Sequence, residues 1–233
     1  MSNGTCGKNL TWTLDDEGTL TISGTGDMEN YSWQKETPWQ VRRDSIQEII
    51  IEAGVTSIGR EAFSNCKNLS AVKIPDGIIS VGELAFNGCD SLTEIKIPDS
   101  VTHIGEGTFS NCRSLTEIKI PIGVTAIEGY TFMSCMSLRQ IKIPDNVTYI
   151  GESAFDCCAL LWKIELPDGL KEIDDFAFRD CMSLREITIP ASVTEIGNEI
   201  FGNCISLKKI YYEVGYDFED KLLEDNDAEL IPC

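Results

Sequence analysis

Histidine and long apolar runs are both scarce in this chain of 233 residues. His103 is the only histidine, so a Ser–His–acid triad would depend on that residue alone. Equivalent positions elsewhere in the chain carry Ser, Ala, Tyr or Glu, and we interpret His103 as a surface residue rather than a catalytic one. No apolar run approaches the ~18–20 residues that a membrane-spanning helix needs, so we expect no membrane span.

Positive charge is also scarce. The chain has 19 basic and 38 acidic residues, which gives a net charge of −19. Such a charge opposes binding to nucleic acid, which normally leaves a basic footprint. The chain contains neither a phosphate-binding G-x-x-x-x-G-K-[ST] loop nor an H-E-x-x-H zinc motif, and its acidic end lacks the spacing of a calcium loop. We therefore expect no nucleic-acid partner, no cofactor and no metal site.

A repeat of 23 residues dominates what is present. Phenylalanine recurs seven times at this interval, at Phe63, Phe86, Phe109, Phe132, Phe155, Phe178 and Phe201. A cysteine follows each one three residues later, at Cys66, Cys89, Cys112, Cys135, Cys158, Cys181 and Cys204. A solenoid of stacked coils places the same residue over the same residue in this way. The units that begin at these seven cysteines are called coils 1 to 7 below.

Each unit follows the pattern C-x-x-L-x-x-I-x-I-P-x-x-V-x-x-I-G-x-x-A-F-x-x. The alternation in L-x-x-I-x-I predicts a short strand with inward isoleucines and an outward residue between them. Stacking makes these strands parallel and ~4.8 Å apart, and the proline ends each one. The A-F-x-x-C segment suits a helical or 3₁₀ turn that brings Phe and Cys into the core. The glycine column predicts a turn conformation that other residues resist; it comprises Gly59, Gly82, Gly105, Gly151 and Gly197.

Ten cysteines would suggest disulfides in a short secreted chain. Stacked identical positions hold their Cβ vectors parallel, whereas a disulfide needs vectors that converge. We therefore interpret the seven repeat cysteines as buried, reduced core residues. Cys6, Cys157 and Cys233 lie outside this column, and their redox state stays open.

The chain divides into three segments. Residues 1–45 form an N-terminal cap, in which apolar alternation on both sides of Gly18 predicts a β-hairpin, and Trp12, Trp33 and Trp39 are expected to close the core. Residues 46–212 form the array, with one irregular coil and seven regular coils. Residues 213–233 form an acidic C-terminal cap or tail, and Tyr211-Tyr212 and Leu230-Ile231 are expected to supply the last strands.

The repeat resembles the BspA-like leucine-rich-repeat proteins of bacteria. The residues that carry the resemblance are the I-P-x-x-V-T-x-I-G-x-x-A-F-x-x-C-x-S-L-x-x-I runs, as in Ile97 to Ile118, and they cover roughly residues 46–212. The opening segment from Gly4 to Gly26 resembles the cap of that family. Periodicity and resemblance together predict a β-rich leucine-rich-repeat solenoid of 23-residue repeats. It would have a parallel concave β-sheet, short helical or 3₁₀ turns opposite, and an N-terminal β-hairpin cap.

The resemblance implies a cell-surface or secreted protein that adheres to host or matrix proteins, and it supplies no catalytic residues. The first residues, Met1 to Gly4, lack the basic and apolar regions of a signal peptide. They fit either a cytosolic protein or a mature form, so the expected location comes from the resemblance alone. The expected partner is an extracellular protein or a surface glycan, and the oligomeric state is not defined by the sequence.

One surface feature stands out from the repeat. The outward residue between the strand isoleucines is lysine in four successive coils, at Lys73, Lys96, Lys119 and Lys142, here called the lysine ladder. This column and the one two residues before it hold 6 basic and 5 acidic residues from Glu48 to Tyr211, a net charge of +1, whereas the other 13 basic and 33 acidic residues give −20. The candidate ligand-binding residues are the lysine ladder with Glu94, Glu117, Gln140, Trp162, Lys163, Glu165 and Tyr211. A third column adds Arg139, Arg185 and Lys208.

Two interpretations of this face stay open. Glutamates and lysines on neighbouring strands neutralise each other, or the face recognises an anionic patch or an acidic glycan. In the second interpretation the lysine ladder sets the electrostatic preference and Trp162 and Tyr211 are anchors, since aromatic residues are common hot spots. The predicted function is non-catalytic recognition or adhesion through the concave sheet. The alternative is a structural spacer that presents another domain, and an enzyme or toxin with an unrecognised site is less favoured.

Overall fold

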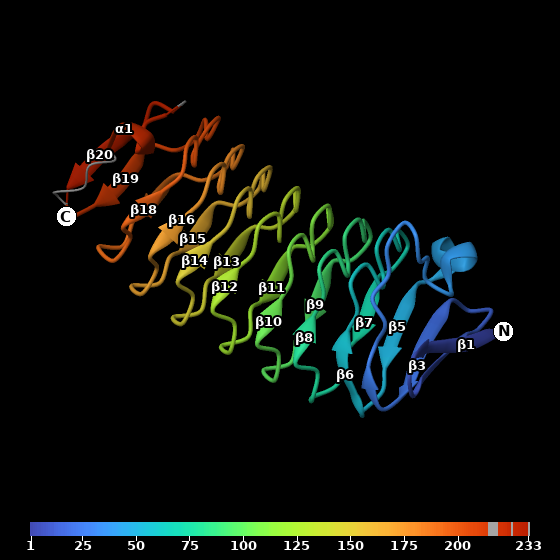
Figure 1. Ribbon diagram of the computed structural model, residues 1–233. Coiled ribbons are helices and arrows are strands. Elements are labelled where there is room, and N and C mark those ends of the chain that lie inside the picture. Colours follow the sequence, from blue (N-terminus) through green and yellow to red (C-terminus); the bar gives the residue numbers. More distant parts are fainter. Residues whose placement is uncertain (214–218, 225, 233) are drawn as a thin grey trace.

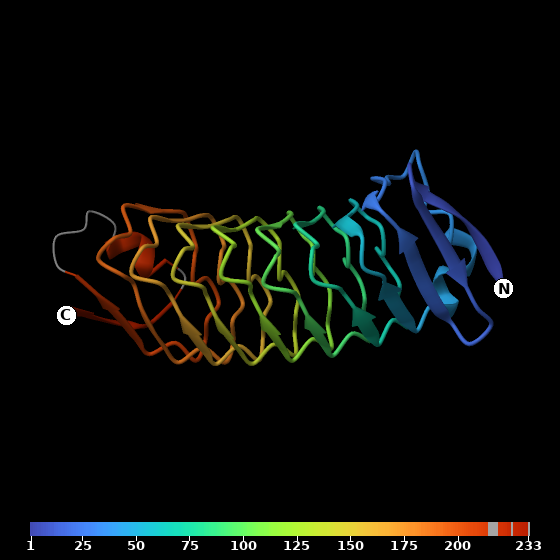
Figure 2. The same cartoon turned by 90° about the horizontal axis from the view of Figure 1, so that it is seen from below.

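The chain folds into an elongated solenoid in the computed structural model, with its two ends at opposite ends of the long axis (Figures 1 and 2). The structure describes residues 1–213, 219–224 and 226–232. Successive coils stack along the axis, and each of coils 1 to 6 adds a short strand to two separate rows. The predicted solenoid of 23-residue coils with a parallel sheet is confirmed.

The first row contains the predicted strands. It comprises β5 (Glu48–Ile51), β7 (Ala71–Lys73), β9 (Glu94–Lys96), β11 (Glu117–Lys119), β13 (Gln140–Lys142), β15 (Lys163–Glu165), β17 (Glu186–Thr188) and β19 (Lys209–Tyr212). Parallel ladders at the 23-residue register join β5 to β7, β9 to β11, β13 to β15 and β17 to β19, so that Lys119 lies beside Lys96. In coils 2 to 6 the isoleucine inside each strand is buried and the residues on both sides of it are exposed, as in Glu94, Ile95 and Lys96.

A second row of strands runs along the solenoid and was not predicted. It comprises β4 (Gly26–Asp27), β6 (Val55–Ile58), β8 (Ser80–Val81), β10 (His103–Ile104), β12 (Ala126–Ile127), β14 (Tyr149–Ile150), β16 (Glu172–Ile173) and β18 (Glu195–Ile196). Most of these strands have only two residues, too few for an alternating pattern to show in the sequence. Their parallel pairing holds the V-x-x-I part of each coil in register.

The turns around the phenylalanines are single hydrogen-bonded turns. The amide of Cys135, for example, donates to the carbonyl of Phe132 at 3.1 Å. Tyr130 and Ser134 flank this phenylalanine with φ values of 58° and 60°. Such left-handed residues cannot continue a right-handed helix, so each turn remains isolated. The Phe132 amide instead donates to the Ala154 carbonyl of the next coil at 2.8 Å, which joins the coils on this side as well.

The glycine column has a different cause from the one predicted. Gly105 and Gly151 do not have positive φ. A Cβ atom on Gly105 would lie 2.5 Å from the backbone nitrogen of Glu83, and one on Gly151 would lie 2.5 Å from that of Gly129. Glycine is needed here because the backbones of adjacent coils come too close for a side chain.

The core is a continuous column of aromatic rings. The centroids of successive phenylalanines are 5.3 to 5.8 Å apart from Phe63 to Phe201, and all seven side chains are buried. Trp39 stacks on Phe63 at 5.7 Å, and Trp12 packs edge-on against Trp39 at 5.8 Å. These two tryptophans close the N-terminal end of the core as predicted.

Trp33 does not belong to this core, and its prediction was wrong. It lies in a tight turn closed by two backbone hydrogen bonds between Ser32 and Lys35, and it is 85% exposed. A two-residue turn of this kind leaves its central side chains in solvent. The hydrophobicity of Trp33 therefore says nothing about its burial.

The repeat cysteines form a second buried column, as predicted. From coil 2 onward each thiol donates to the carbonyl of a phenylalanine in the preceding turn, as Cys112 does to Phe86 at 3.2 Å. Burial raises the pKa of the Cys112 thiol to about 12, so it stays protonated and can donate. The nine described cysteines are all free. Cys233 lies outside the described residues.

The two ends of the array are closed differently. At the N-terminus β1 (Ser2–Gly7), β2 (Leu10–Leu14) and β3 (Thr19–Gly24) form an antiparallel meander, so the predicted hairpin gains a third strand; a 3₁₀ helix follows at Gln40–Ser45. Strand β3 pairs in parallel with β5 and joins the cap to the array. At the C-terminus β20 (Glu229–Pro232) pairs with β19, which confirms the predicted last strands. A helical turn, α1 (Glu219–Leu222), inserts the buried Leu222 beside them.

Candidate functional site

A groove of about 870 Å³ runs along the exposed face of the first row. The buried strand residues Ile95, Ile118 and Ile141 lie beneath it. The groove brings together nine of the eleven predicted site residues: Lys73, Glu94, Lys96, Glu117, Lys119, Gln140, Lys142, Lys163 and Glu165. The parallel register explains this, since it sets each column in a straight line across the strands.

The four ladder lysines differ in how they are paired. Lys73 Nζ lies 2.8 Å from Glu48 on the neighbouring strand, and Lys119 Nζ lies 2.8 Å from Asp99 in the preceding turn. Within the described part of the chain, no carboxylate is within 4.0 Å of the Lys96 or Lys142 ammonium groups. Lys73 and Lys119 therefore fit the neutralisation interpretation. Lys96 and Lys142 place positive charge in the groove that no described carboxylate neutralises.

Lys163 and Glu165 form an ion pair along strand β15, with 2.8 Å between Nζ and Oε1. The hydrogen bond from Lys163, followed by the charges of Lys163 and Lys142, lowers the pKa of the Glu165 carboxyl. Lys142 is the register partner of Glu165 on the adjacent strand. Positive charge thus outweighs negative charge around this glutamate, although both ion-pair partners are exposed and the pair adds little to stability.

Trp162 and Tyr211 lie apart from the groove lining. Trp162 is 50% exposed on the chain segment that enters β15. Tyr211 is half-buried in β19, where it is the register partner of Ile231. Trp162 thus presents a large exposed aromatic surface next to the groove residue Lys163, whereas Tyr211 presents less.

Exposed apolar residues follow the repeat cysteines in coils 4 to 7, a feature that the sequence analysis missed. Met136, Leu160, Met182 and Ile205 are exposed in coils 4 to 7, and we call them the apolar rim. Each comes one or two residues after a repeat cysteine, where coils 1 to 3 carry Lys67, Asn68, Asp90, Ser91, Arg113 and Ser114. A comparison of the columns beside the cysteines, coil by coil, could have found this change.

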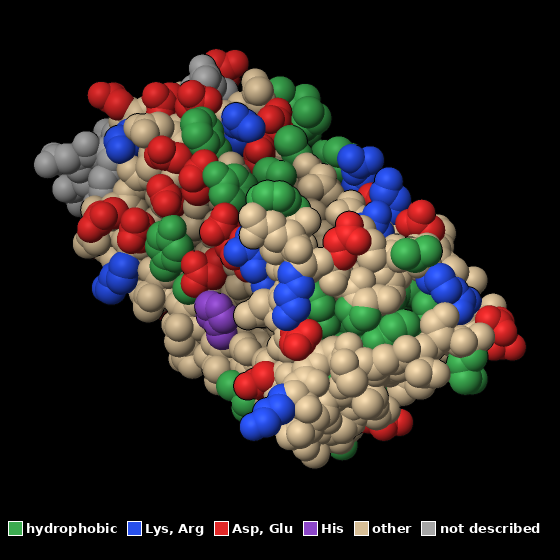
Figure 3. Space-filling view, turned by 45° about the vertical axis from the view of Figure 1, so that its right-hand side comes forward, with side chains coloured by type: hydrophobic (Ala, Val, Ile, Leu, Met, Phe, Trp, Pro, Cys, Tyr) green, Lys and Arg blue, Asp and Glu red, His purple; other side chains and the backbone are tan. Residues whose placement is uncertain are grey.

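The second row has the opposite charge in its C-terminal part. Glu172 and Glu195 are register partners on β16 and β18. Burial, with the charges of Glu195 and Asp174, raises the pKa of the Glu172 carboxyl. The Tyr149 hydroxyl donates to Asp174 at 3.1 Å. Figure 3 shows acidic side chains gathered toward the C-terminal end of the face in view.

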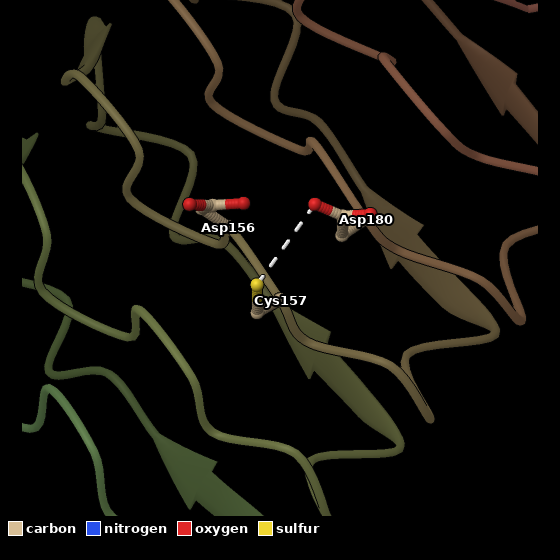
Figure 4. Close-up of side chains that lie close together, drawn as sticks. All are labelled: Asp156, Cys157 and Asp180. Carbon is tan, nitrogen blue, oxygen red and sulfur yellow. Dashed lines mark hydrogen bonds between the residues drawn. The ribbon is translucent and has the colours of Figure 1, made fainter.

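Asp156, Cys157 and Asp180 converge on the turn side of coils 4 and 5 (Figure 4). Their ligand atoms lie within 4.8 Å of one another, a spacing that a metal ion could bridge. Arg179, however, donates to both oxygens of the buried Asp156 carboxylate, at 3.1 and 2.8 Å, and stacks on Phe176 at 4.9 Å. The cluster is accordingly an ion pair between adjacent coils, in which the guanidinium already satisfies the buried charge.

The backbone conformation of Cys157 brings its side chain into this cluster. It has φ of 60°, in a column where other coils carry Asn, Gly, Ser or Asp. Burial, with the charges of Asp156 and Asp180, raises the pKa of its thiol to about 11. Cys157 is therefore a neutral, half-buried thiol, which is a poor nucleophile at neutral pH.

His103 is exposed on β10, as predicted. No helix in the described part of the chain is long and apolar enough to cross a membrane.

Comparison with known proteins agrees with this architecture. A leucine-rich-repeat protein from Bacteroides ovatus has 25% sequence identity and a TM-score of 0.60, over 88% of this chain and 70% of that one. The leucine-rich-repeat protein of T. pallidum has 23% identity and a TM-score of 0.52, over 87% of this chain and 90% of the other. A leucine-rich cell-surface protein from Faecalibacterium prausnitzii has 20% identity and a TM-score of 0.48, over 100% of this chain and 94% of the other. None of the curated proteins matches this sequence.

The family model for the BspA-type leucine-rich-repeat region matches residues 42–161 and 103–224, with six copies of the repeat. The matched residues include the first row, all of the second row except β4, and the phenylalanine and cysteine columns of all seven coils. The chain therefore belongs to the BspA-type leucine-rich-repeat family.

Proposed function

We propose that this protein is a non-catalytic recognition module that binds a protein or a surface polymer through the groove of the first row. The lysine ladder sets its electrostatic preference, and Glu94, Glu117, Gln140, Lys163 and Glu165 line the same contact surface. Trp162 and Tyr211 act as anchors beside it. The segments 1–45 and 213–233 close the ends of the array at residues 46–212.

The observation that carries this proposal is the pair of unpaired lysines in the groove. Lys96 and Lys142 are exposed in the groove, and the described residues offer no ion-pair partner to either. A surface that served only as a spacer would gain nothing from unbalanced charge at these positions, because like charges on neighbouring strands weaken pairing. Binding along one face of the stacked repeats is the common use of such solenoids.

The proposal includes adhesion at the cell surface or after secretion, with an extracellular protein or a surface glycan as partner. Its support is the resemblance of the repeat to a family whose members are associated with adhesion to host or matrix proteins. Repeat families of this kind act by presenting a long surface rather than by placing a few reacting groups together.

The test measures capture of extracellular-matrix proteins and anionic glycans by the purified chain across a salt series. We expect one class to be captured, with affinity that falls as salt rises, because screening weakens exposed charge contacts. Replacing all four ladder lysines with glutamate should weaken this capture while circular dichroism and the melting temperature stay close to those of the parent.

Capture of nothing on the panel would overturn the proposal in favour of a spacer. Capture that the four-lysine variant leaves unchanged would move the contact surface away from the groove. Turnover in a hydrolase screen would overturn the non-catalytic assignment.

A further inference from the structure

Positive charge and apolar surface coincide on one edge of coils 4 to 7. The two positions that enter each first-row strand carry Arg139, Lys163, Arg185, Lys208 and Lys209 in these coils, with Trp162 among them. We call these six residues the basic strip. The only acidic residue at the same positions of coils 4 to 7 is Glu186, whereas coils 1 to 3 have no basic residue there and carry Glu94 and Glu117.

The cations of the basic strip are mostly unpaired. All five are exposed, and only Lys163 has an ion-pair partner among the described residues. No described carboxylate lies within 4.0 Å of Arg139, Arg185, Lys208 or Lys209. Four cations with no ion-pair partner among the described residues, on a chain with a net charge of −19, are an imbalance that the fold itself does not require.

The arrangement follows from the coil register. Arg139, Trp162, Arg185 and Lys208 are equivalent positions in consecutive coils, so they line up across the strands. Backbone hydrogen bonds connect Trp162 to Arg139 at 3.0 Å and Lys208 to Arg185 at 2.8 Å, which fixes this order. The strand spacing of ~4.8 Å places the two arginines on either side of Trp162, roughly 10 Å apart.

The apolar rim lies on the same edge. Met136, Leu160, Met182 and Ile205 each precede the basic strip by two to four residues in their own coils, and Ile205 is 72% exposed. Exposed apolar side chains that gather next to one another, rather than singly, are typical of protein-binding sites. Methionine and tryptophan are also enriched at the centres of such sites, together with arginine.

We propose that coils 4 to 7 bind an acidic polypeptide segment whose carboxylates pair with the basic strip and whose apolar side chains pack on Trp162 and the apolar rim. The inference rests on the proposed recognition function and names the chemistry of its partner. The apolar rim favours a polypeptide over a sulfated or carboxylated glycan, because a glycan offers anionic groups without matching apolar side chains. Charge repulsion from the rest of the acidic body is screened beyond about 8 Å at physiological salt, so the local cations dominate at contact.

The test uses a fluorescein-labelled peptide of about ten residues, long enough in extended form to cross four coils. Its residues are glutamate, leucine and serine, and two control peptides replace either glutamate by glutamine or leucine by serine. We expect the parent peptide to bind in a fluorescence-anisotropy titration with the full chain, and each control peptide to bind about tenfold more weakly.

Two protein variants locate the contact. R139E/R185E should weaken binding of the acidic peptide about tenfold or more. K67E/R113E changes the net charge by the same amount at exposed positions of coils 1 and 3, and it should bind as the parent does. With 5-fluorotryptophan in place of the four tryptophans, we expect the peptide to shift the ¹⁹F resonance of Trp162, assigned with Trp162→Phe, and to leave those of Trp12, Trp33 and Trp39 unchanged.

Several outcomes overturn the inference. They are an absence of peptide binding, equal binding by both charge variants, or heparin binding that R139E/R185E abolishes while the peptide does not bind. Self-association that R139E/R185E removes in sedimentation experiments would make the occupant a second copy of this chain. If a matrix partner is captured through the lysine ladder and R139E/R185E does not weaken that capture, the proposed function stands. The basic strip is then not the binding site.

Discussion

Coils 1 to 3 and coils 4 to 7 share an interior but differ in their surface. The phenylalanine rings stack without interruption through both parts, and every repeat cysteine is buried. Outside, coils 1 to 3 carry three of the four ladder lysines, whereas coils 4 to 7 carry the basic strip, the apolar rim and the acidic pair Glu172–Glu195. Stacking constrains the inward positions of every coil alike and leaves the outward positions free. Function should therefore follow the outward differences.

The largest expected effect tests whether the interiors are equivalent. Phe86→Ala and Phe155→Ala should each lower the free energy of unfolding by about 3–5 kcal/mol, since each removes a fully buried ring from the stack and leaves a cavity. Urea denaturation followed by circular dichroism measures both.

Similar losses for Phe86→Ala and Phe155→Ala would support a common interior. A difference of more than about 2 kcal/mol between them would contradict it, because two sites with the same burial should lose similar transfer and cavity terms. The exposed Trp33→Ala serves as control and should change stability by less than about 0.5 kcal/mol.

A smaller expected effect compares the loss of one arginine ion pair in each part of the array. Arg179→Met should lower the free energy of unfolding by about 2 kcal/mol, because it leaves the buried Asp156 carboxylate without its two charged hydrogen bonds. Arg113→Met removes an ion pair between coils 2 and 3 at a different repeat position, where the Arg113 and Asp90 side chains are 3.8 Å apart and are 59% and 37% exposed. Arg113→Met should lower the free energy of unfolding by less than about 0.5 kcal/mol.

Chemical denaturation of both arginine variants and of Asp156→Asn measures this contrast. A double-mutant cycle between Arg179→Met and Asp156→Asn isolates the pair from the packing of Arg179 on Phe176. Equal costs for Arg179→Met and Arg113→Met would show that the burial of Asp156 does not strengthen its pair.

Much of the fold could be predicted because the repeat makes each inward position visible seven times. The phenylalanine and cysteine columns, the first-row strands and the last strands at Tyr211 and Leu230 all follow from apolar periodicity. The second row escaped prediction because strands such as Ser80–Val81 are too short to show a period. The glycine column was predicted correctly as special but for the wrong reason, since sequence cannot distinguish a turn conformation from a close approach of backbones.

The candidate site was less predictable than the fold. Register alone brings the lysine ladder and its neighbours to one groove, which a 23-residue period implies. Whether a given lysine is paired depends on side-chain reach, as with Lys119 and Asp99, and the period does not contain this information. Burial of a single aromatic residue is equally undetermined: Trp39 and Trp33 lie six positions apart, yet one closes the core and the other is in solvent.

The smallest expected effect concerns the acidic pair in the second row. Its raised pKa means that Glu172 binds a proton more tightly in the folded than in the unfolded chain. The ionised pair therefore destabilises the fold at neutral pH, and this penalty disappears as the pH falls through the folded-state pKa. Glu172→Gln should raise the free energy of unfolding at pH 7 by about 0.2–1 kcal/mol, the range for like charges on facing strand positions.

Urea denaturation of Glu172→Gln and the parent from pH 7 down to pH 4 tests this expectation. The two stability curves should converge in acid, where Glu172 of the parent is protonated. Glu106→Gln, an exposed change in coil 2, serves as control and should show no such convergence. A stability gain for Glu172→Gln that persists at pH 4 would assign the effect to packing instead of charge. The Glu172–Glu195 pair would then destabilise the fold no more than the uncharged Ser57–Ser80 pair does at the same positions near the N-terminus.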